Sequence, residues 1–225
     1  DLHSTSRRQR QMCIRDRMSG EQKLKDGDEI IQELEFTNNC DLLFFTDKCQ
    51  VYKAKADDFA QTKASVLGDY VAAKLGFDEG ENAVKMVVTK DYKGMLLFAF
   101  ENGKAAKVPL ESYATKTNRK KLTGAYSDKS PLVGLLYMPE DEEVLFKASS
   151  GNMLLVHTGL LALKTTRSTQ GVAVLKPKKG HRLFSVERYK EGTFTNPKRY
   201  RTASLPARGA LPVSDDSKNE QLSLI

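Results

Sequence analysis

The sequence predicts an all-β fold, a propeller-like array in which a hairpin unit of about 50 residues recurs. Three stretches align without gaps, at 41–59, 95–113 and 143–161, so successive copies are offset by 54 and then 48 residues. Each stretch has an apolar strand, a short polar turn and a second strand of alternating character, which is the pattern of a β-hairpin. A further apolar strand closes each unit, and four-stranded blades are the simplest architecture.

The hairpin turns differ between the copies. Asn102-Gly103 predicts a type I′ turn and Ser150-Gly151 a similar one, since glycine adopts a positive φ without steric penalty. In the first copy Lys48-Cys49 replaces the glycine, and we expect that turn to be looser or of another type. The closing apolar strands are predicted at 84–88, 132–137 and 183–186.

The chain divides into segments around these hairpins. Residues 1–17 hold five arginines against two aspartates and no hydrophobic period. We interpret them as a non-native, adaptor-derived segment and exclude them from fold reasoning, the alternative being a basic nucleic-acid arm. The remaining predicted segments are an upstream blade remnant at 18–35, blades at 36–88, 89–139 and 140–190, a strap at 191–210 that packs on the array, and a disordered tail at 211–225.

Charge is segregated along the chain. The formal net charge is +7, of which residues 1–17 contribute +3 and the rest +4. Residues 112–127 contain four bases and no acid, residues 162–190 contain eight bases against one glutamate, and residues 140–143 are all acidic. The pattern predicts one basic and one acidic rim on the array. A basic rim favours duplex DNA as the partner, because its phosphates attract lysine and arginine regardless of sequence.

Twelve residues are the candidate DNA-binding set. Three of its lysines recur in register after the hairpins, and the others lie on or near the basic segments. The blander alternative is that these bases only keep a β-rich surface solvated and block edge pairing. The set is Lys63, Lys107, Lys116, Arg119, Lys120, Lys121, Lys164, Arg167, Lys176, Lys178, Lys179 and Arg182.

The sequence offers no constellation for catalysis. It has no glycine-rich phosphate loop, no metal-ligand spacing among His3, His157 and His181, and no nucleophile with a placed histidine. Cys40 and Cys49 are expected to stay reduced, as in a cytosolic protein. No apolar run of about 18 residues and no signal peptide are present, so we expect a cytoplasmic location and no membrane.

Two stretches, LLFAFENGKAAKVPL and TTRSTQGVAVLKPKKGHRL, carry a resemblance to a known family. They resemble the repeats in the C-terminal domain of the A subunit of bacterial type IIA DNA topoisomerases, gyrase and topoisomerase IV. RMSGEQKLKDGD near the start is also similar to one branch of that family. The resemblance covers about residues 17–205, and the segment with Arg167, Thr169 and Gly171 strengthens it.

The resemblance implies a β-pinwheel, here incomplete, whose basic outer edge wraps double-stranded DNA in the bacterial nucleoid. It also implies that the isomerase contains an ATPase B subunit, together with a second copy of the A subunit. ATP and Mg²⁺ would act through other domains and subunits, with no cofactor in this fragment. The winged-helix region with its nucleophilic tyrosine is not visible, so this fragment is expected to be non-catalytic. The glutamine-arginine-arginine-glycine-rich box of gyrase is not found either, but its blade would lie upstream, so gyrase and topoisomerase IV both stay open.

A protein interaction module of propeller type is the second hypothesis. In that case the acidic link at 140–143 or the basic rim would dock a protein partner.

Overall fold

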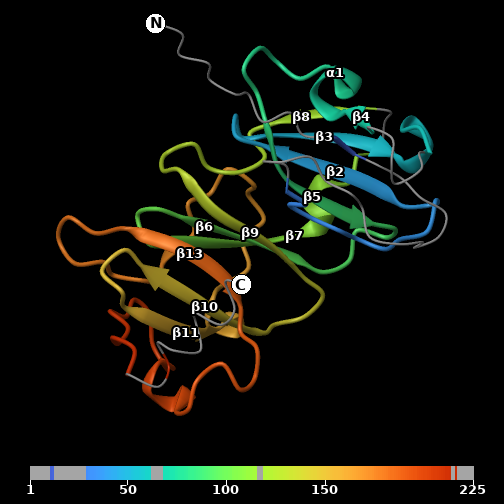
Figure 1. The fold of residues 1–225 in the computed structure, drawn as a ribbon. Helices are drawn as coiled ribbons and strands as arrows, with labels where there is room; N and C mark the ends of the chain where they lie inside the picture. The colour runs from blue at the N-terminus through green and yellow to red at the C-terminus, as the bar shows by residue number, and fades with distance from the viewer. Residues whose placement is uncertain (1–10, 13–28, 62–67, 116–118, 214–215, 217–225) are drawn as a thin grey trace, which may run out of the picture. The chain divides into compact units, whose positions relative to one another are not determined.

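The computed structural model describes residues 11–12, 29–61, 68–115, 119–213 and 216. It forms two compact units, which are described separately. Unit 1 comprises residues 1–91 with 115–123, and unit 2 comprises residues 92–114 with 124–225. Strands dominate both units (Figure 1), and the described residues contain a single short α-helix, α1 (Val71–Leu75). The prediction of an all-β fold is confirmed.

Unit 1 is built on a four-stranded antiparallel sheet in the order β5-β2-β3-β8. Its central strand β2 is buried along its whole length, which explains the unbroken apolar run at residues 42–45. Phe44 packs on Phe59 with ring centroids 5.6 Å apart, and Tyr52 packs on Phe77 at 4.4 Å. The strands are β2 (Asp41–Thr46), β3 (Gln50–Lys55), β5 (Ala83–Thr89) and β8 (Lys121–Thr123).

A two-stranded sheet completes unit 1. Strand β1 (Gln11–Met12) pairs with β4 (Asp69–Tyr70), and Met12 is buried in the same apolar cluster as Leu42 and Phe44. Residues 11–12 therefore contribute to the fold. The expectation that no part of segment 1–17 belongs to it is wrong at these two positions. The adaptor origin of the segment stays a prediction.

Unit 2 contains a four-stranded sheet, β12-β7-β6-β9, and a three-stranded sheet, β11-β10-β13. Leu97, Val144 and Phe146 belong to one buried cluster that draws side chains from both sheets. The strands are β6 (Met95–Phe100), β7 (Lys104–Pro109), β9 (Leu132–Met138), β10 (Glu143–Ala148), β11 (Met153–His157), β12 (Val172–Ala173) and β13 (Leu183–Arg188).

The hairpin repeat is present as the sequence indicated. The hairpins β2–β3, β6–β7 and β10–β11 begin at Asp41, Met95 and Glu143, the residues that start the three aligned stretches. Each hairpin runs into a short 3₁₀ turn: η1 (Ala56–Asp58), η2 (Leu110–Tyr113) and η3 (Thr158–Leu160). The closing apolar strand then pairs with the first hairpin strand, as β5 with β2, β9 with β6 and β13 with β10.

The outer edge of each hairpin is covered by a segment from farther along the chain. The amide of Lys53 on β3 donates to Lys120, the amide of Lys164 donates to Lys107 on β7, and the amide of Leu155 on β11 donates to Tyr200, at 2.7–2.8 Å. These three hairpin positions are equivalent in the repeat. In the two four-stranded sheets, the strand that covers the hairpin edge therefore comes later in the sequence than the closing strand of that sheet. The predicted blades each consist of one continuous stretch of sequence, and their boundaries stay a prediction.

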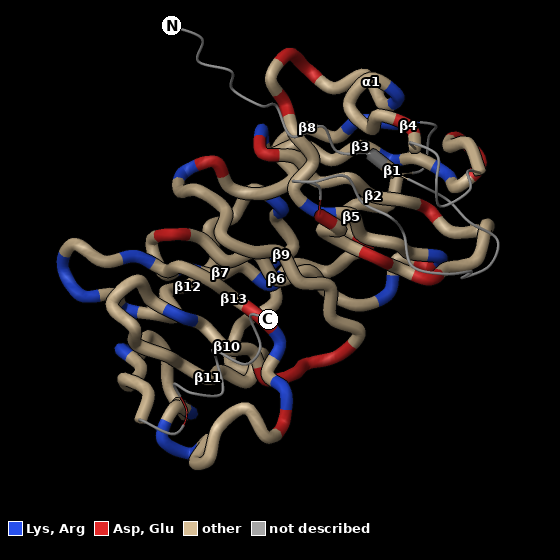
Figure 2. The backbone as a smooth tube through the Cα atoms, viewed as in Figure 1, with Lys and Arg blue, Asp and Glu red and all other residues tan. Residues whose placement is uncertain are grey.

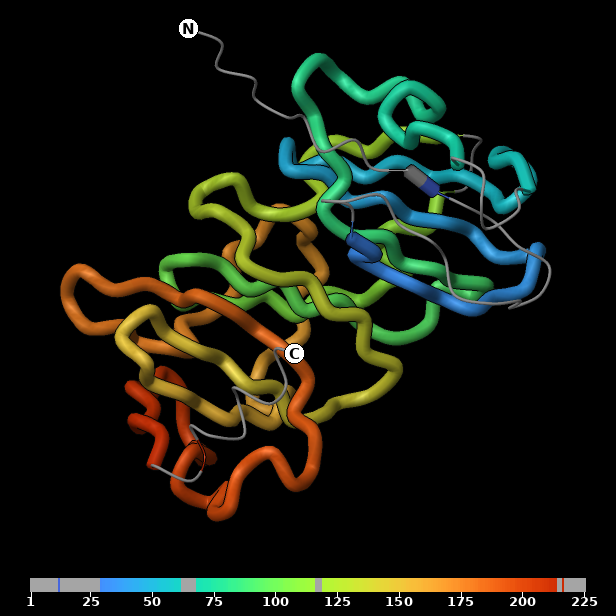
Figure 3. The backbone as a smooth tube through the Cα atoms, in the orientation of Figure 1, coloured from blue at the N-terminus to red at the C-terminus, as the bar shows by residue number. Residues whose placement is uncertain are grey.

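The predicted strap supplies the outer edge of the third sheet (Figure 3). Arg201 bridges to Leu155, and Met153 and Ala210 exchange two backbone hydrogen bonds at 2.8 and 2.9 Å. Part of the predicted tail is also fastened, because the Leu211 carbonyl accepts from Arg199 and the Val213 amide donates to the Tyr200 hydroxyl. Asp216 is 1% exposed and accepts hydrogen bonds from Tyr200 at 2.5 Å and from the amide of Thr195 at 2.8 Å. The prediction of disorder is wrong at Asp216, and residues 214–215 and 217–225 lie outside the described ones.

All three hairpin turns have the same backbone geometry. Cys49, Gly103 and Gly151 have φ of 55°, 77° and 81°, and their amides donate to the residue three positions earlier. Asn102 is not among the residues with positive φ, so the turn is a three-residue loop ending in a left-handed residue rather than type I′. The expectation of a different first turn is also wrong, since Cys49 adopts the conformation that glycine takes elsewhere.

Gly171→Ala should destabilise unit 2 by more than the cost of placing alanine in a left-handed backbone conformation. Gly171 has φ +70°, and a Cβ atom there would collide with the carbonyl oxygen of Ala105 on β7. A left-handed conformation costs a non-glycine residue about 1–2 kcal/mol, and a collision with backbone adds to this cost. We expect the free energy of unfolding, measured by urea denaturation, to fall by about 3 kcal/mol.

Gly180→Ala is the matched control. Gly180 also has a positive φ, +80°, but a Cβ atom there would meet nothing within 4 Å. Its expected cost is only about 1 kcal/mol. Equal losses in the two variants would contradict the close approach of residue 171 to β7.

Candidate nucleic-acid interface

The segments that cover the sheet edges carry five of the twelve predicted DNA-binding residues and lead directly into three more. In unit 1, Lys120 and Lys121 lie on the segment that pairs with β3. In unit 2, residues 163–175 run along β7, and Lys176, Lys178 and Lys179 follow them. Each edge segment is outermost in its sheet, so its side chains reach solvent more readily than those of the strands inside. Lys63 and Lys116 lie outside the described residues.

Lys121 already has partners within unit 1. Its Nζ donates to both carboxylate oxygens of Asp78 at 2.9 Å and lies 5.3 Å from the centroid of the Tyr52 ring. The hydrogen bond to Asp78 raises the pKa of Lys121, and the same bond lowers the pKa of Asp78. Lys121 thus offers less charge to a phosphate than its exposed neighbours Arg119 and Lys120.

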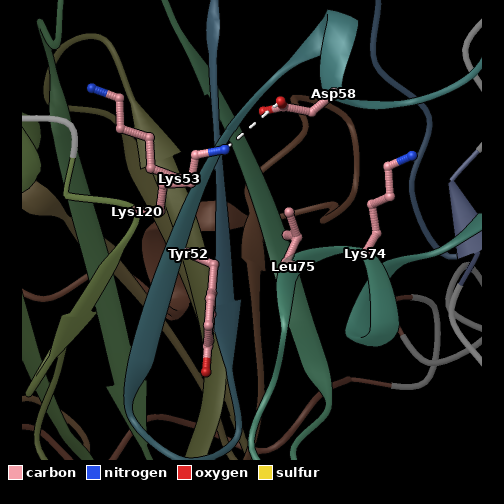
Figure 4. A pocket seen from close by; sticks show the side chains of 6 residues that line it. All are labelled: Tyr52, Lys53, Asp58, Lys74, Leu75 and Lys120. Carbon is pink, nitrogen blue, oxygen red and sulfur yellow. Dashed lines mark ion pairs between the residues drawn. The ribbon is translucent and has the colours of Figure 1, made fainter.

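Lys120 also lines a shallow pocket of about 120 Å³ in unit 1 (Figure 4). Each lysine of the pocket faces a carboxylate, with nitrogen–oxygen distances of 2.9 Å for Lys53–Asp41, 3.5 Å for Lys74–Asp69 and 3.9 Å for Lys120–Asp58. The Lys120 side chain is 74% exposed, so of the three its ammonium is the most available to an external anion. The lining residues are Tyr52, Lys53, Asp58, Lys74, Leu75 and Lys120.

Arg167 acts inside unit 2 as a clamp. Its side chain is half-buried, its Nη1 donates to the carbonyl oxygen of Ser112 at 2.9 Å, and its guanidinium lies 5.9 Å from the centroid of the Tyr113 ring. Gln170 accepts a hydrogen bond from Lys104 Nζ at 3.0 Å. The loop between Lys164 and Gly171 is therefore fastened to η2 and β7. Contact of Lys164 or Arg167 with DNA stays a prediction.

The basic tip loop, residues 176–182, carries four exposed basic side chains in unit 2. The amide of His181 donates to Lys178 at 2.9 Å, and Gly180 has φ +80°, the geometry of a type II turn. The buried residues Leu175 and Leu183 hold its two ends. In Figure 2 the loop carries several blue stretches, the colour of lysine and arginine. Its exposed bases are Lys176, Lys178, Lys179 and Arg182.

Lys107 belongs to the candidate DNA-binding set but is buried, so its predicted place on the basic rim is wrong. It is 5% exposed, and its Nζ donates to Asp141 at 2.8 Å and to the carbonyl oxygen of Thr158 at 2.9 Å. The Thr158 hydroxyl also donates to Asp141, at 2.7 Å. A lysine on an interior strand must satisfy its charge within the protein, because a buried unpaired ammonium is unstable. Lys107 therefore stabilises unit 2 and cannot reach DNA.

The acidic link at 140–143 is also largely balanced within unit 2. Besides the Asp141 contact, Arg188 donates to Glu142 at 2.9 Å, and Arg201 forms a two-pronged contact with Glu143 at 2.6 and 2.7 Å. Three of the four carboxylates thus have basic partners, which leaves the link poorly suited to dock a basic protein.

The candidate set missed the bases of the strap. Lys198, Arg199 and Arg208 are exposed on the segment that covers β11, the place that residues 163–175 occupy on β7. A sequence signal existed, because a base followed by threonine and, some residues later, by glycine occurs in both segments, as Lys164 to Gly171 and Arg201 to Gly209.

The described residues contain no group of three or more histidine, cysteine, aspartate or glutamate side chains that could hold a metal ion. Within the same part of the chain, no helix has the length and apolar character needed to cross a membrane.

The repeated hairpins with covered outer edges define a β-pinwheel of the type found in the A subunits of type IIA topoisomerases. The chain superposes on the C-terminal domain of DNA topoisomerase IV with a TM-score of 0.72 at 21% identity, covering 84% of this chain and 64% of that one. The C-terminal domain of E. coli ParC superposes with a TM-score of 0.63 at 14% identity, covering 85% of this chain and 84% of that one. The C-terminal domain of DNA gyrase A superposes with a TM-score of 0.58 at 19% identity, covering 88% of this chain and 68% of that one. These likenesses show the fold.

Among curated sequences the similarity is to the A subunit of DNA gyrase. The protein of Mycobacterium bovis is 27% identical over 171 residues, which are 74% of this chain and 20% of that protein. The Streptomyces coelicolor protein is 27% identical over 182 residues, and the Metamycoplasma arthritidis protein 24% over 204. The chain spans about a fifth of the length of these relatives. No family model matches the chain. The predicted resemblance to the A subunits of gyrase and topoisomerase IV is confirmed.

Lys107→Met should destabilise unit 2 in a pH-dependent way. Burial raises the pKa of Asp141, but the hydrogen bonds from Lys107 and Thr158 outweigh it and hold that pKa below its ordinary value. The pair's contribution is therefore complete above about pH 4 and is lost as pH falls through the lowered pKa. We expect a loss of about 2 kcal/mol at neutral pH, because Asp141 stays partly exposed, and a smaller loss near pH 3.

Urea denaturation at both pH values measures this difference, with Lys147→Met as the control. Lys147 pairs with Glu187, which is 49% exposed, so its loss should cost less than about 1 kcal/mol. A Lys107→Met variant as stable as wild type at neutral pH would contradict the structural role of the buried lysine.

Proposed function

We propose that this chain is the DNA-binding and DNA-wrapping C-terminal domain of the A subunit of a type II DNA topoisomerase. The observation that carries the proposal is the placement of the bases. The segments that cover β3 and β11 are the outermost of their sheets and bear exposed lysines or arginines, and the segment that covers β7 runs directly into the exposed Lys176, Lys178 and Lys179. The similarity to the A subunit of DNA gyrase supports the same conclusion.

Exposed bases on edge segments suit a sequence-tolerant DNA surface. Duplex DNA carries one negative charge per roughly 1.7 Å of its axis, and neutralising phosphates releases condensed counterions. Such binding needs no particular base sequence, and its strength depends steeply on salt. The ion pairs that engage Lys107 and Lys121 leave Lys120, Lys178 and Lys179 as the stronger candidates for phosphate contacts.

Catalysis would belong to other parts of the enzyme. We propose that this segment is non-catalytic and binds neither ATP nor Mg²⁺ itself. The isomerase chemistry would come from the cleavage core and a second copy of the A subunit, with ATP hydrolysed by a B subunit. The whole enzyme would act on the bacterial chromosome in the cytoplasm. Gyrase and topoisomerase IV both stay open as the parent enzyme.

Electrophoretic retardation of a DNA fragment over a salt series tests the proposal. With about six phosphates contacted, the slope of log affinity against log salt should be near −5. The same slope is expected for fragments of unrelated sequence. No binding at low salt, or a flat salt response, would refute the proposal.

Replacing both Lys178 and Lys179 by glutamine should weaken binding to all sequences alike. Each lost phosphate contact reduces the salt slope by about 0.9, so the double variant should have a slope smaller by about 2. The control is Lys55→Gln with Lys147→Gln, which removes the same charge from lysines already paired with Asp41 and Glu187. If the two double variants lose affinity equally, net charge rather than the basic tip loop governs binding.

A further inference from the structure

The closing strand of each sheet carries a β-bulge at the same repeat position. In unit 1, Phe45 pairs with Lys85 and Thr46 with Ala83, so Val84 is the extra residue. In unit 2 the equivalent pairings skip Val133 on β9 and Phe184 on β13. A bulge redirects the side chain of its extra residue, and bulges are common beside functional sites. Its recurrence in three sheets makes it a regular part of the repeat.

The three extra residues differ in their surroundings. Val84 and Val133 are half-buried, and Val133 packs against the apolar cluster of unit 2. Phe184 is 67% exposed, the most exposed large hydrophobic residue among those described. The same β-bulge therefore has two outcomes. On β9 it directs Val133 toward apolar neighbours, and on β13 it directs Phe184 into solvent.

Phe184 is exposed beside the exposed lysines and arginine of the basic tip loop. It follows the basic tip loop directly, and the intervening Leu183 is 1% exposed and anchors the strand in the core. The Arg182 side chain is 65% exposed and forms an ion pair with Glu101 at 3.8 Å. The exposed Phe184 ring thus lies where the loop joins β13, and Lys178 and Lys179 lie at the turn of that loop.

We propose that Phe184 is an apolar wedge that enters between adjacent base pairs of bound duplex DNA, while the basic tip loop holds the flanking phosphates. This inference rests on the proposed DNA-binding function and deepens it by naming the contact that bends the DNA. Phenylalanine wedges partly unstack a base step and kink the duplex by about 20–90°. The unstacking costs a few kcal/mol and is offset by the additional phosphate contacts that the bend allows.

The charges beside Phe184 favour DNA over an apolar protein surface. A protein partner, or a second copy of this chain, would have to bury Lys178, Lys179 and Arg182 at the margin of an apolar contact, without the phosphates that match them. DNA offers both kinds of surface at once, an apolar base stack and anionic phosphates close to it. The exposed ring and its basic neighbours are then satisfied by the same ligand.

Base unstacking can be measured directly with the full 225-residue chain and a duplex that contains 2-aminopurine. Wild type should increase the fluorescence of the probe severalfold, since stacking quenches it, and should shorten the end-to-end distance of a doubly labelled fragment. Phe184→Ala should lose most of both signals. Its affinity should fall by about tenfold, the usual effect of losing one aromatic–base contact, with an unchanged salt slope.

Two variants sharpen the test. Phe184→Trp keeps an aromatic wedge and should retain the fluorescence increase. Leu160→Ala removes another exposed apolar side chain of unit 2, 43% exposed on η3, and should behave as wild type. Because Phe184 is exposed, its replacement should leave the circular dichroism spectrum unchanged.

The outcomes separate the two proposals. If wild type does not bind DNA, the proposed function fails and the wedge with it. If wild type binds and Phe184→Ala keeps the fluorescence increase, DNA binding stands and the wedge is refuted. Self-association in sedimentation that depends on Phe184, with no change in fluorescence on DNA, would refute it in favour of a second copy as the occupant.

Discussion

The exposed backbone edge of each second hairpin strand is the constraint on which the rest of this structure depends. Strands β3, β7 and β11 each present amides and carbonyls that their own hairpin cannot pair, and an unsatisfied buried backbone group costs about 1–3 kcal/mol. In each sheet a segment from farther along the chain satisfies them. The covering backbone approaches so closely that Gly103, Gly171 and Gly209 have no room for a Cβ atom. Edge pairing therefore determines how the chain is routed.

The same routing decides which bases reach solvent. A segment laid along a sheet edge has protein on one side and solvent on the other, so lysines there can remain hydrated. Lys107 lies one strand farther in and is held by Asp141 and Thr158 instead. The acidic link follows the same rule, since Glu142 and Glu143 face arginines from β13 and the strap. Some of the charged residues therefore form ion pairs within the protein, and other lysines and arginines are exposed. Only the exposed ones are available to bind phosphates.

Small irregularities adapt a regular repeat to different tasks. The bulge on the closing strand recurs in all three sheets, yet it directs Val133 toward the core and Phe184 outward. The strap behaves similarly: it occupies the edge position of an ordinary strand, and Asp216 fastens it through Tyr200 and Thr195. In both cases the backbone arrangement is the same in the repeats. The identity of one side chain then decides which contacts are made at that position.

The sequence by itself determined the hairpins, their offsets and the all-β fold, because strand alternation and turn conformation are local properties of neighbouring residues. It also located the basic segments and the family that they resemble. Only the tertiary structure decided that the outer strand of each sheet comes from a later segment, that Cys49 takes a glycine-like conformation, and that Lys107 is buried. It alone revealed the exposure of Phe184. These features depend on contacts between residues tens of positions apart, and a residue's type does not say which distant backbone or carboxylate it will meet.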